Sequence, residues 1–332
     1  MVEKIRVSIG SAAVLGLENK QFPVPPRTCY VMTYIEGHCI ANCGFCPQAR
    51  DSTSSSNQLS RVSWPIYLFK DFLTKLKYLT QSKKFKRICI QTLNYERNFQ
   101  DLREIIIDVK KVTNTPISVA IPPMSKEKLK ELKIVGVERL GIALDGATEE
   151  IFDKVKGKQV NGPYKWEKHL KCLDDALDIF SRGFVSTHLI VGMGESQKEM
   201  IELIIKLNNK GILPALFAFT PIKGTKFERL NKPDLIGFRK IQLGRYLILS
   251  KQKKIKDIAF NNKGEIINLN INPTELKNII DESNAFLTSG CPGCDRPYYT
   301  SNPSGPIYNF PRKLTEEQKE EIFNSLKRFV NF

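Results

Sequence analysis

The chain has 332 residues, 41% of them hydrophobic, and a formal net charge of +16. This length suits one large α/β domain with an appended segment, or two domains, and it can bury a sizeable core. No apolar run approaches the roughly 20 residues of a membrane span, and the first ten residues lack the apolar centre of a secretory signal. These features predict a soluble, cytoplasmic protein with no membrane partner.

The positive charge is concentrated in lysine-rich runs at residues 83–87 and 251–256. Such runs attract acidic partners or nucleic acid, but they also occur as ordinary solvated surface. No stripe of interleaved aromatic residues and no nucleic-acid motif accompanies them. We therefore predict no nucleic-acid partner and leave an acidic protein partner open.

Short apolar or β-branched runs alternate with helical patterns from about residue 27 onward. The predicted strands are Thr28–Thr33, Arg87–Gln91, Ile117–Ile121, Arg139–Ala143, Phe184–Val191 and Pro214–Thr220. The predicted helices are Pro65–Leu79, Asp101–Val112, Ser125–Leu132, Thr148–Val155, Trp166–Phe180, Ser196–Asn208, Lys232–Ser250 and Thr315–Phe329. Repeated strand–helix units predict an α/β fold with a parallel sheet, curved into a full or partial (β/α) barrel of the TIM type.

The alternation of strands and helices becomes irregular beyond Ile258, and residues 289–312 are rich in glycine and proline. We therefore divide the chain into an N-terminal extension at residues 1–27, a barrel at 28–260 and a C-terminal extension at 261–332. The last of these contains two of the eight cysteines. Uneven, clustered cysteines in a long chain favour metal binding over a disulfide framework.

The most informative motif is C-x3-C-x2-C, formed by Cys39, Cys43 and Cys46 after the first predicted strand. Three thiolates in eight residues can hold three irons of a cubane iron–sulfur cluster and leave the fourth iron open to chemistry. Gly44 lets the backbone wrap closely around such a group. A structural zinc knuckle is the alternative, but zinc normally needs a fourth ligand, and His38 is a poor candidate.

With Phe45 as its aromatic residue, this loop resembles the C-x3-C-x-aromatic-C signature of radical S-adenosylmethionine (SAM) enzymes, and the resemblance covers roughly residues 28–260. It implies a [4Fe–4S] cluster whose open iron binds SAM, and a 5′-deoxyadenosyl radical that abstracts hydrogen from an unactivated carbon. The protein then holds the cofactor, excludes water and orients the target bond.

The resemblance also implies cofactor contacts at several strand ends. The implied positions are Phe45, Gln91, Asp145, Gly192, Gly194, Glu195, Phe219 and Pro221. The turn at Gly192–Glu195 is equally typical of an ordinary strand–helix connection, and Asp145 equally suits a loop cap. The second strand ends in Gln91-Thr92-Leu93-Asn94, where the family commonly has Gly-Gly-Glu.

A second set of thiols is predicted from Cys291 and Cys294, a C-x2-C pair, together with Cys29 at the start of the first strand. A C-terminal segment that folds under the barrel would bring the three together as ligands of an auxiliary cluster, with Ser301 or Ser304 as a guess for the fourth ligand. The pair also suits a redox couple or half a zinc site, and Cys29 suits a small buried apolar residue. We interpret Cys89 and Cys172 as structural core residues.

Two clusters in one such enzyme imply sulfur insertion, and the sequence around Cys43–Gln48 resembles biotin and lipoyl synthases. The tail at residues 289–299 is most similar to a subunit of the two-protein lipoyl synthases. That resemblance implies two [4Fe–4S] clusters, SAM, a reductant such as ferredoxin, a second synthase subunit, and an octanoylated lipoyl carrier domain as substrate. The alternatives are a biotin synthase-like enzyme acting on dethiobiotin, with a [2Fe–2S] donor and Arg245 as its inward arginine, or a zinc or redox protein.

Overall fold

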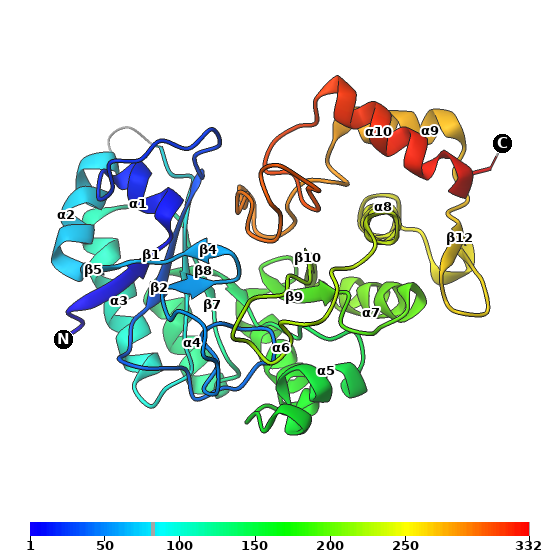
Figure 1. Ribbon diagram of the computed structural model, residues 1–332. Helices are drawn as coiled ribbons and strands as arrows, with labels where there is room; N and C mark the ends of the chain where they lie inside the picture. Colours follow the sequence, from blue (N-terminus) through cyan, green and yellow to red (C-terminus); the bar gives the residue numbers. More distant parts are fainter. Residues whose placement is uncertain (81–83, 332) are drawn as a thin grey trace.

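The computed structural model describes residues 1–80 and 84–331 (Figure 1). Its main sheet has eight strands in the order β10-β9-β8-β7-β6-β2-β1-β5. Their bounds are β1 Lys4–Val7, β2 Thr28–Thr33, β5 Ile66–Leu68, β6 Arg87–Gln91, β7 Ile117–Ala120, β8 Val137–Gly141, β9 Val185–Val191 and β10 Leu213–Ala218. The six strands from β2 to β10 run parallel, whereas β1 and β5 are antiparallel additions beside β2.

Helices lie between successive parallel strands, and further helices precede β2 and follow β10. The bounds of the helices are α1 Ile9–Leu15, α2 Phe69–Thr80, α3 Asn98–Val112, α4 Lys126–Ile134, α5 Glu149–Lys156, α6 Trp166–Phe180, α7 Gln197–Lys210, α8 Leu235–Lys251, α9 Pro273–Glu282 and α10 Glu316–Leu326. Two short hairpins add β3 Gln58–Leu59 with β4 Val62–Ser63, and β11 Ala259–Phe260 with β12 Ile266–Asn268. Helix α7 illustrates the local rules: Ser196 and Glu199 form a capping box, and Gly211 ends the helix at a φ of 85°.

The parallel strands are buried on both faces, and all residues of β2 and β6 are buried. One face packs on the helices through a continuous apolar core, and the other faces the lumen of an open barrel. Within the described residues the sheet does not close, because β10 and β5 remain its edge strands. Nor is any helix there apolar over enough length to cross a membrane.

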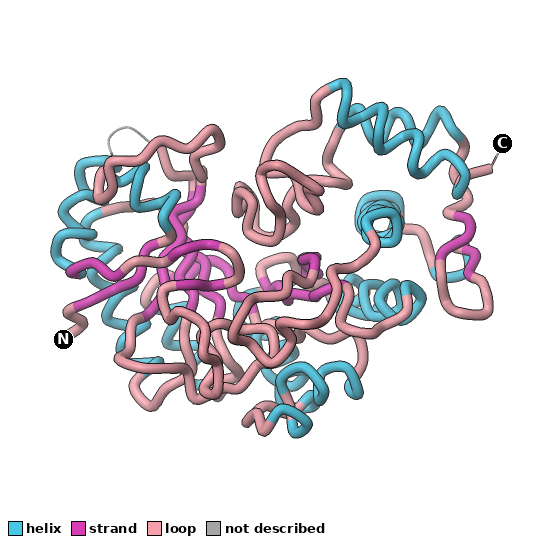
Figure 2. The backbone as a smooth tube through the Cα atoms, viewed as in Figure 1, coloured by secondary structure: helices cyan, strands magenta, loops and turns pink. Residues whose placement is uncertain are grey.

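The C-terminal extension covers the free edge of the barrel. Ser289 accepts a hydrogen bond from the backbone N–H of Leu216 on β10 (2.8 Å), and Asn309 donates to the carbonyl of the same residue (3.1 Å). From there the loop crosses to β2, where Asp295 accepts a hydrogen bond from the Arg27 backbone N–H (2.7 Å). Figure 2 shows this loop extending from α9 and α10 toward the barrel, and Figure 1 shows both helices beyond α8.

The predicted α/β fold with a partial barrel is confirmed, and the six predicted strands correspond to β2 and β6 to β10. The predicted helix Pro65–Leu79 is wrong at its start, because Ile66–Leu68 pair with β1 as β5. β1, α1 and α9 were not predicted. β1 lies in the expected N-terminal extension yet belongs to the main sheet, and Lys83 of the basic run lies outside the described residues.

Candidate active site

The loop that carries Cys39, Cys43 and Cys46 follows β2 at the carboxyl end of the barrel. The N–H of Cys39 bonds to the carbonyl of Gln48 (2.9 Å), and the N–H of Cys46 bonds to the carbonyl of Cys43 (3.0 Å). The N–H of Asn94, beyond β6, points at the sulfur of Cys39 (3.1 Å). Such a donor stabilises a thiolate, so the loop is organised by backbone contacts around its sulfurs.

Gly44 has no room for a side chain, because an added Cβ would lie 2.6 Å from the ring of Phe227. The N–H of Gly44 donates to the carbonyl of Val155 (2.8 Å), and the carbonyl of Gly44 accepts the N–H of Phe227 (2.9 Å). The turn between Cys43 and Cys46 is therefore held against two other segments. The close approach of Phe227 therefore explains why position 44 is a glycine.

The three thiols are poor acids in this environment. Burial raises the pKa of Cys43 to about 12, although the charge of Lys156 opposes the shift, and burial also raises the pKa values of Cys39 and Cys46. They would ionise on binding iron, which deprotonates coordinating thiols. No three His, Cys, Asp or Glu side chains converge on a single metal ion in the part of the chain described. A cubane cluster places each thiolate on a different iron, so the donor chemistry of this loop fits a cluster.

A cavity of about 180 Å³, here called the central cavity, extends from Cys46 into the barrel lumen. Four of the predicted cofactor positions line it, namely Phe45, Gln91, Asp145 and Phe219. His188 and Phe217 line its inner wall, and Tyr299 and Arg296 of the C-terminal loop complete it. The cavity therefore joins residues from β6, β9, the segment after β10 and the C-terminal loop beside the cysteine loop.

A buried ion pair lies between the cysteine loop and this cavity. Lys156 donates hydrogen bonds to Asp145 (2.8 Å) and to the carbonyl of Ala143 (2.8 Å), and both charged side chains are at least nine-tenths buried. Burial lowers the pKa of Lys156, but the charges of Asp145 and Cys43 outweigh burial and the net shift is upward. A permanently charged ammonium beside the thiols favours their ionised form.

The remaining predicted cofactor positions do not line the central cavity. Gly192 and Gly194 have positive φ values (99° and 118°), and the carboxylate of Glu195 accepts hydrogen bonds from the N–H groups of Gly192 (2.6 Å) and Met193 (3.0 Å). The positive φ values account for the two glycines, and the two hydrogen bonds account for Glu195, so the structure of the turn explains its sequence. Pro221 follows the lining residue Thr220 but does not line the cavity.

The second set of thiols differs from the prediction in one member. Cys291 and Cys294 line a small cavity of about 30 Å³, here called the thiol cavity, and the third cysteine there is Cys89 of β6. The register pairs Tyr30 with Cys89 and Cys29 with Ile88, so Cys29 points to the opposite face of the sheet. There Cys29 packs with Ile88 in the helix-facing core, and the structure does not bring it to Cys291 and Cys294.

The C-terminal loop folds under the barrel, as the sequence indicated. Thr28 donates to the carbonyl of Gly293 (3.0 Å), and Ser118 donates to the sulfur of Cys291 (3.4 Å). The hydroxyl of Tyr30 lies 3.6 Å from the sulfur of Cys294. Because the thiol cavity has room for only about one or two waters, a cluster there requires the turn at residues 290–294 to move outward.

Arg296 lies where the cavities meet, since it lines both the central cavity and the thiol cavity. Its guanidinium lies among the rings of Tyr30, Phe217 and Tyr299, with 5.1–5.5 Å between guanidinium carbon and ring centroids. Its buried Nε has no hydrogen-bond partner among the described residues. Arg245, the arginine considered from sequence, instead donates to the carbonyl of Pro214 (2.6 Å) and lines neither cavity.

The two serines considered as fourth ligands do not line the thiol cavity. Ser301 is buried and accepts the N–H of Tyr308 (2.9 Å), whereas Ser304 is exposed. The serines that do line it are Ser118, Ser186 and Ser289.

Sequence reasoning missed Lys156, His188, Arg296 and Tyr299, and it assigned Cys89 to the core. Cys172 is buried as expected, with its sulfur accepting the Met124 N–H at 3.4 Å. A signal existed for His188, because Ser186, His188 and Ile190 alternate along β9 and line the lumen. No such signal existed for Lys156, because its sequence context is that of an ordinary lysine on a helix surface.

The sequence model of the Radical SAM superfamily matches residues 34–207, just over half of the chain. The chain therefore belongs to the radical SAM superfamily, whose members use a [4Fe–4S] cluster and SAM. The loop and cavity described above lie within or beside the matched region.

Named relatives point to one branch of that superfamily. The biotin synthase of Methanococcus aeolicus is 28% identical over 211 residues, which is 61% of this chain but only 59% of that protein, less than two thirds of its length. The biotin synthase of Streptococcus agalactiae serotype III is 24% identical over 280 residues, 82% of this chain and 80% of that protein. The chain is thus biotin synthase-like in sequence.

Solved structures agree at the level of the fold. Methylornithine synthase (PylB) superposes with a TM-score of 0.50 and 16% identity, covering 66% of this chain and 62% of that one. The [FeFe]-hydrogenase maturase HydG from Carboxydothermus hydrogenoformans gives a TM-score of 0.52 and 17% identity, covering 66% and 51%. At such identities the likeness concerns the fold alone.

Proposed function

We propose that this protein is a sulfur-inserting radical SAM enzyme and one subunit of a two-protein lipoyl synthase. The observation that carries the proposal is that cysteines from two separate sets line two cavities that meet in one barrel lumen. Cys46 lines the central cavity and Cys89, Cys291 and Cys294 line the thiol cavity, while Arg296 lines both. Sulfur insertion needs a radical source and a sulfur source on two sides of one substrate carbon, and this arrangement supports it.

The first set, Cys39, Cys43 and Cys46, would hold the [4Fe–4S] cluster with SAM at its open iron. When bound, the two supply a radical that abstracts hydrogen from an unactivated carbon. The chain contributes the buried ammonium of Lys156, which offsets negative charge at the thiolates. Phe45, Phe217 and Phe219 line the central cavity and exclude water from it.

The second set would hold the auxiliary cluster that supplies sulfur, with Cys89 in the place expected for Cys29. Burial raises the pKa of Cys294 to about 11, and the charge of Arg296 opposes the shift. The arginine therefore favours a thiolate at that position. It also lies on the route between the two cavities, where a substrate carbon would meet the donor.

The proposed substrate is an octanoyl chain on a lysine of a lipoyl carrier domain. The net charge of +16 suits an acidic carrier domain through long-range attraction. The remaining proposed partners are the second synthase subunit and a reductant such as ferredoxin. All three partners follow from the resemblance of the tail at residues 289–299.

A second candidate is sulfur insertion into dethiobiotin. Biotin synthases are the named relatives, and Arg296 beside three cysteines matches the inward arginine that such an enzyme would use with a [2Fe–2S] donor. Under this alternative the as-isolated protein would show the absorption of a [2Fe–2S] centre.

The test supplies both substrates to the anaerobically reconstituted protein with SAM and reductant. One arm contains an octanoylated lipoyl-domain peptide and its derivatives thiolated at C6 or at C8, because one subunit of a pair adds one of two sulfurs. The other arm contains dethiobiotin. We expect a peptide mass gain of one sulfur atom and none for dethiobiotin. Sulfur added only to dethiobiotin would establish the second candidate. Zinc-binding, colourless protein that does not cleave SAM would overturn both.

A further inference from the structure

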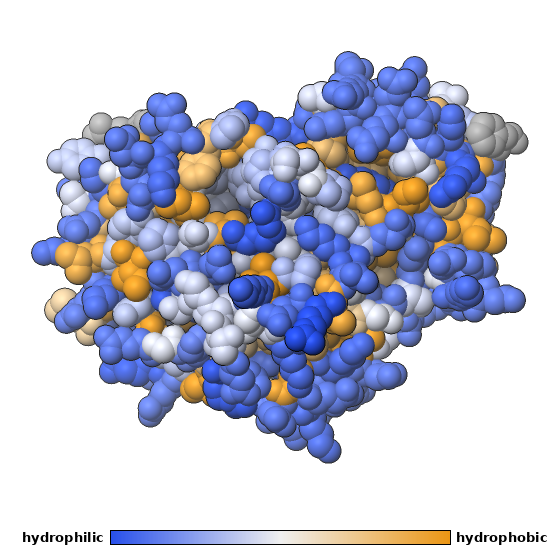
Figure 3. Space-filling model, viewed as in Figure 1, coloured by the Kyte–Doolittle hydropathy of each residue, from blue (hydrophilic) through white to orange (hydrophobic). Residues whose placement is uncertain are grey.

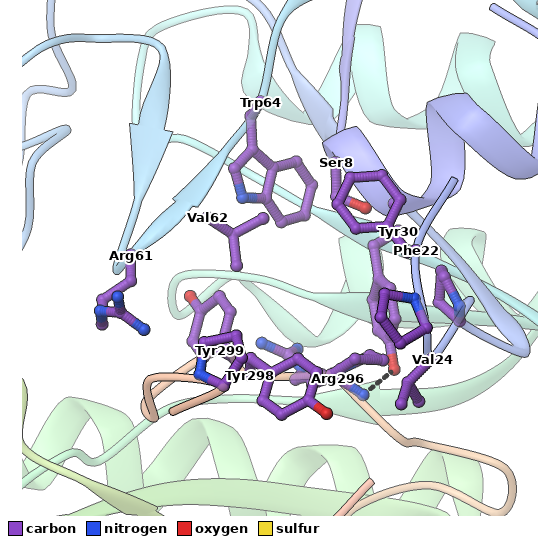
Figure 4. A pocket seen from close by; sticks show the side chains of 15 residues that line it. Ser8, Phe22, Val24, Tyr30, Arg61, Val62, Trp64, Arg296, Tyr298 and Tyr299 are labelled. Atoms are coloured by element: carbon purple, nitrogen blue, oxygen red, sulfur yellow. Dashed lines mark hydrogen bonds between the residues drawn. The ribbon is translucent and has the colours of Figure 1, made fainter. Parts of the chain in front are cut away.

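A third cavity, here called the outer cavity, lies between the N-terminal segment and the C-terminal loop and has a volume of about 280 Å³. Figure 4 shows its lining side chains converging from four parts of the chain, and Figure 3 shows a hollow in the surface between those segments. The lining residues are Ser8 and Gly10 around the start of α1, Phe22, Pro23, Val24 and Pro26, Tyr30 of β2, Arg61, Val62 and Trp64 around β4, and Arg296, Pro297, Tyr298, Tyr299 and Pro303.

The wall of the outer cavity is apolar and aromatic. It contains no carboxylate and no amide side chain, and its only charged groups are Arg61 and Arg296. Such a wall favours saturated carbon, because each methylene that it buries removes apolar surface from water. The volume lies just below the range of about 300–1,000 Å³ typical of small-molecule pockets, which suits a slender ligand.

The cavity has an exposed end and a buried end. Phe22 and Arg61 are exposed, with Phe22 at 37% of its maximum, whereas Trp64 and Tyr30 are 2% and 4% exposed. The indole N–H of Trp64 has no hydrogen-bond partner among the described residues.

The buried end of the outer cavity meets the other two cavities. Arg296 lines all three, Tyr299 lines the outer and central cavities, and Tyr30 lines the outer and thiol cavities. The hydroxyl of Tyr30 accepts the N–H of Arg296 (2.9 Å, dashed in Figure 4) and lies 3.6 Å from the sulfur of Cys294. An occupant that enters past Phe22 would therefore reach the residues that the outer cavity shares with the central cavity and the thiol cavity.

A ureido ring such as that of dethiobiotin finds few acceptors on this wall. Its two N–H groups would depend on the hydroxyls of Tyr298 and Tyr299, because the hydroxyl of Tyr30 already accepts the N–H groups of Asp295 and Arg296 and donates to Asp295. The hydroxyl of Ser8 is bonded to Ser11 (2.9 Å). A buried N–H group left without an acceptor weakens binding.

We infer that the outer cavity binds the unbranched acyl chain of the substrate. The chain enters at the Phe22–Arg61 end, and its reacting carbons lie at the Tyr30–Arg296 end. This inference rests on the proposed function and names the surface that would select an octanoyl group. It also assigns Arg61 to the mouth, where a positive charge faces the incoming carrier domain.

The test measures binding without turnover. The reconstituted full-length protein, without reductant, is titrated by calorimetry with lipoyl-domain peptides carrying saturated chains of four to twelve carbons on the lysine. We expect affinity to rise with chain length up to about eight carbons and then to level off or fall, because the cavity is finite. Equal affinity at every length would overturn the inference.

A pair of variants on one strand locates the binding site. Val62 lines the cavity, and its neighbour Ser63 is exposed and does not. We expect Val62→Trp to weaken binding of the octanoyl peptide at least tenfold and Ser63→Trp to leave binding unchanged, with iron content and thermal midpoint showing that each variant is folded. Val24→Phe repeats the blockage from the opposite wall if Val62→Trp does not fold. Unchanged binding in folded Val62→Trp or Val24→Phe would overturn the inference.

The two proposals fail in different ways. Octanoyl binding that depends on Val62 but leads to no sulfur transfer would remove the proposed function and keep the acyl site. Sulfur transfer together with octanoyl binding that Val62→Trp does not change would keep the proposed function and remove the acyl site.

Discussion

The two sets of thiols in this molecule are built in opposite ways. Cys39, Cys43 and Cys46 lie on one loop, held by hydrogen bonds between neighbouring backbone groups. The second set joins a strand residue, Cys89, to a loop far along the chain, and the contact from Ser118 to Cys291 spans 173 residues. A local site is visible as a spacing in the sequence, whereas a site assembled from distant segments depends on strand register and on how the C-terminal extension folds.

The largest expected effect is that cysteine variants of the two sets lose different reactions. Cys43→Ala removes a ligand of the radical-generating cluster, so we expect no 5′-deoxyadenosine above background when the reconstituted variant is given SAM and dithionite. Cys291→Ala is expected to keep SAM cleavage and lose sulfur transfer. Loss of SAM cleavage in Cys291→Ala as well would show that the two sets do not act separately.

The second prediction compares Cys89 with Cys29, which lie on adjacent strands but face opposite sides of the sheet. Cys89→Ala should lower the iron content from about eight to about four atoms per chain, because one [4Fe–4S] cluster is lost. Cys29→Ala should keep all the iron and lose about 1 kcal/mol of stability from the small cavity created in the core. Iron analysis and urea unfolding measure both. The opposite result would restore the ligand set predicted from sequence.

The third prediction concerns the ion pair that supports the cysteine loop. Lys156→Met leaves the buried carboxylate of Asp145 without its partner, so we expect a loss of about 3–5 kcal/mol in the free energy of unfolding. The matched control is Lys154→Met on the same helix, an exposed position where a change within about 0.5 kcal/mol is expected. The double variant Asp145→Asn/Lys156→Met should recover part of the loss. Equal stability of the two single variants would contradict a buried pair.

The smallest expected effect is a pH dependence in the scaffold beneath this pair. Burial, aided by the charge of Lys156, lowers the pKa of His169 to about 3, from an unfolded value of 6.5. In the unfolded chain His169 therefore binds a proton below pH 6.5, whereas in the folded chain it binds one only below about pH 3. Stability from neutral His169 is complete above pH 6.5 and is lost as the pH falls, by about 2 kcal/mol between pH 7 and pH 5.

The matching measurement compares wild type with His169→Gln by urea unfolding at pH 7 and pH 5. The variant lacks the titrating group, so it should lose about 2 kcal/mol less than wild type over this interval. Cluster loss in acid affects both proteins and cancels in the difference. Identical pH dependence in the two proteins would mean that His169 is protonated in the folded state.

Much of the fold could be predicted because strand–helix alternation is a local signal. Thr28–Thr33, Arg87–Gln91 and Trp166–Phe180 have the predicted bounds, and the partial barrel follows from their order. The N-terminal strand β1 was missed because it pairs with β2 and β5 of the main sheet, a contact that four residues of sequence do not reveal. β5 was absorbed into a predicted helix because Ile66 and Leu68 continue the apolar spacing of α2.

Within the candidate site, the cysteine loop was visible as a spacing, and the positions Phe45, Gln91, Asp145 and Phe219 were implied by the resemblance to radical SAM enzymes. All four of these positions line the central cavity. Lys156 could not be predicted, because its burial depends on how α5 packs over the loop. Arg296 could not either, because its position depends on a loop that returns to the lumen from the far edge of the sheet.

The sequence by itself determined the parallel α/β architecture, the radical SAM loop and the presence of a second cysteine pair. Only the tertiary structure decided which third cysteine accompanies that pair. The physical reason is that Cys29 and Cys89 each lie in a strand whose residues are all buried, so burial does not mark which of the two points to the lumen. Both Cys29 and Cys89 are buried, and the lumen contacts of Tyr30 and Thr28 on either side of Cys29 give the direction that the sequence lacked.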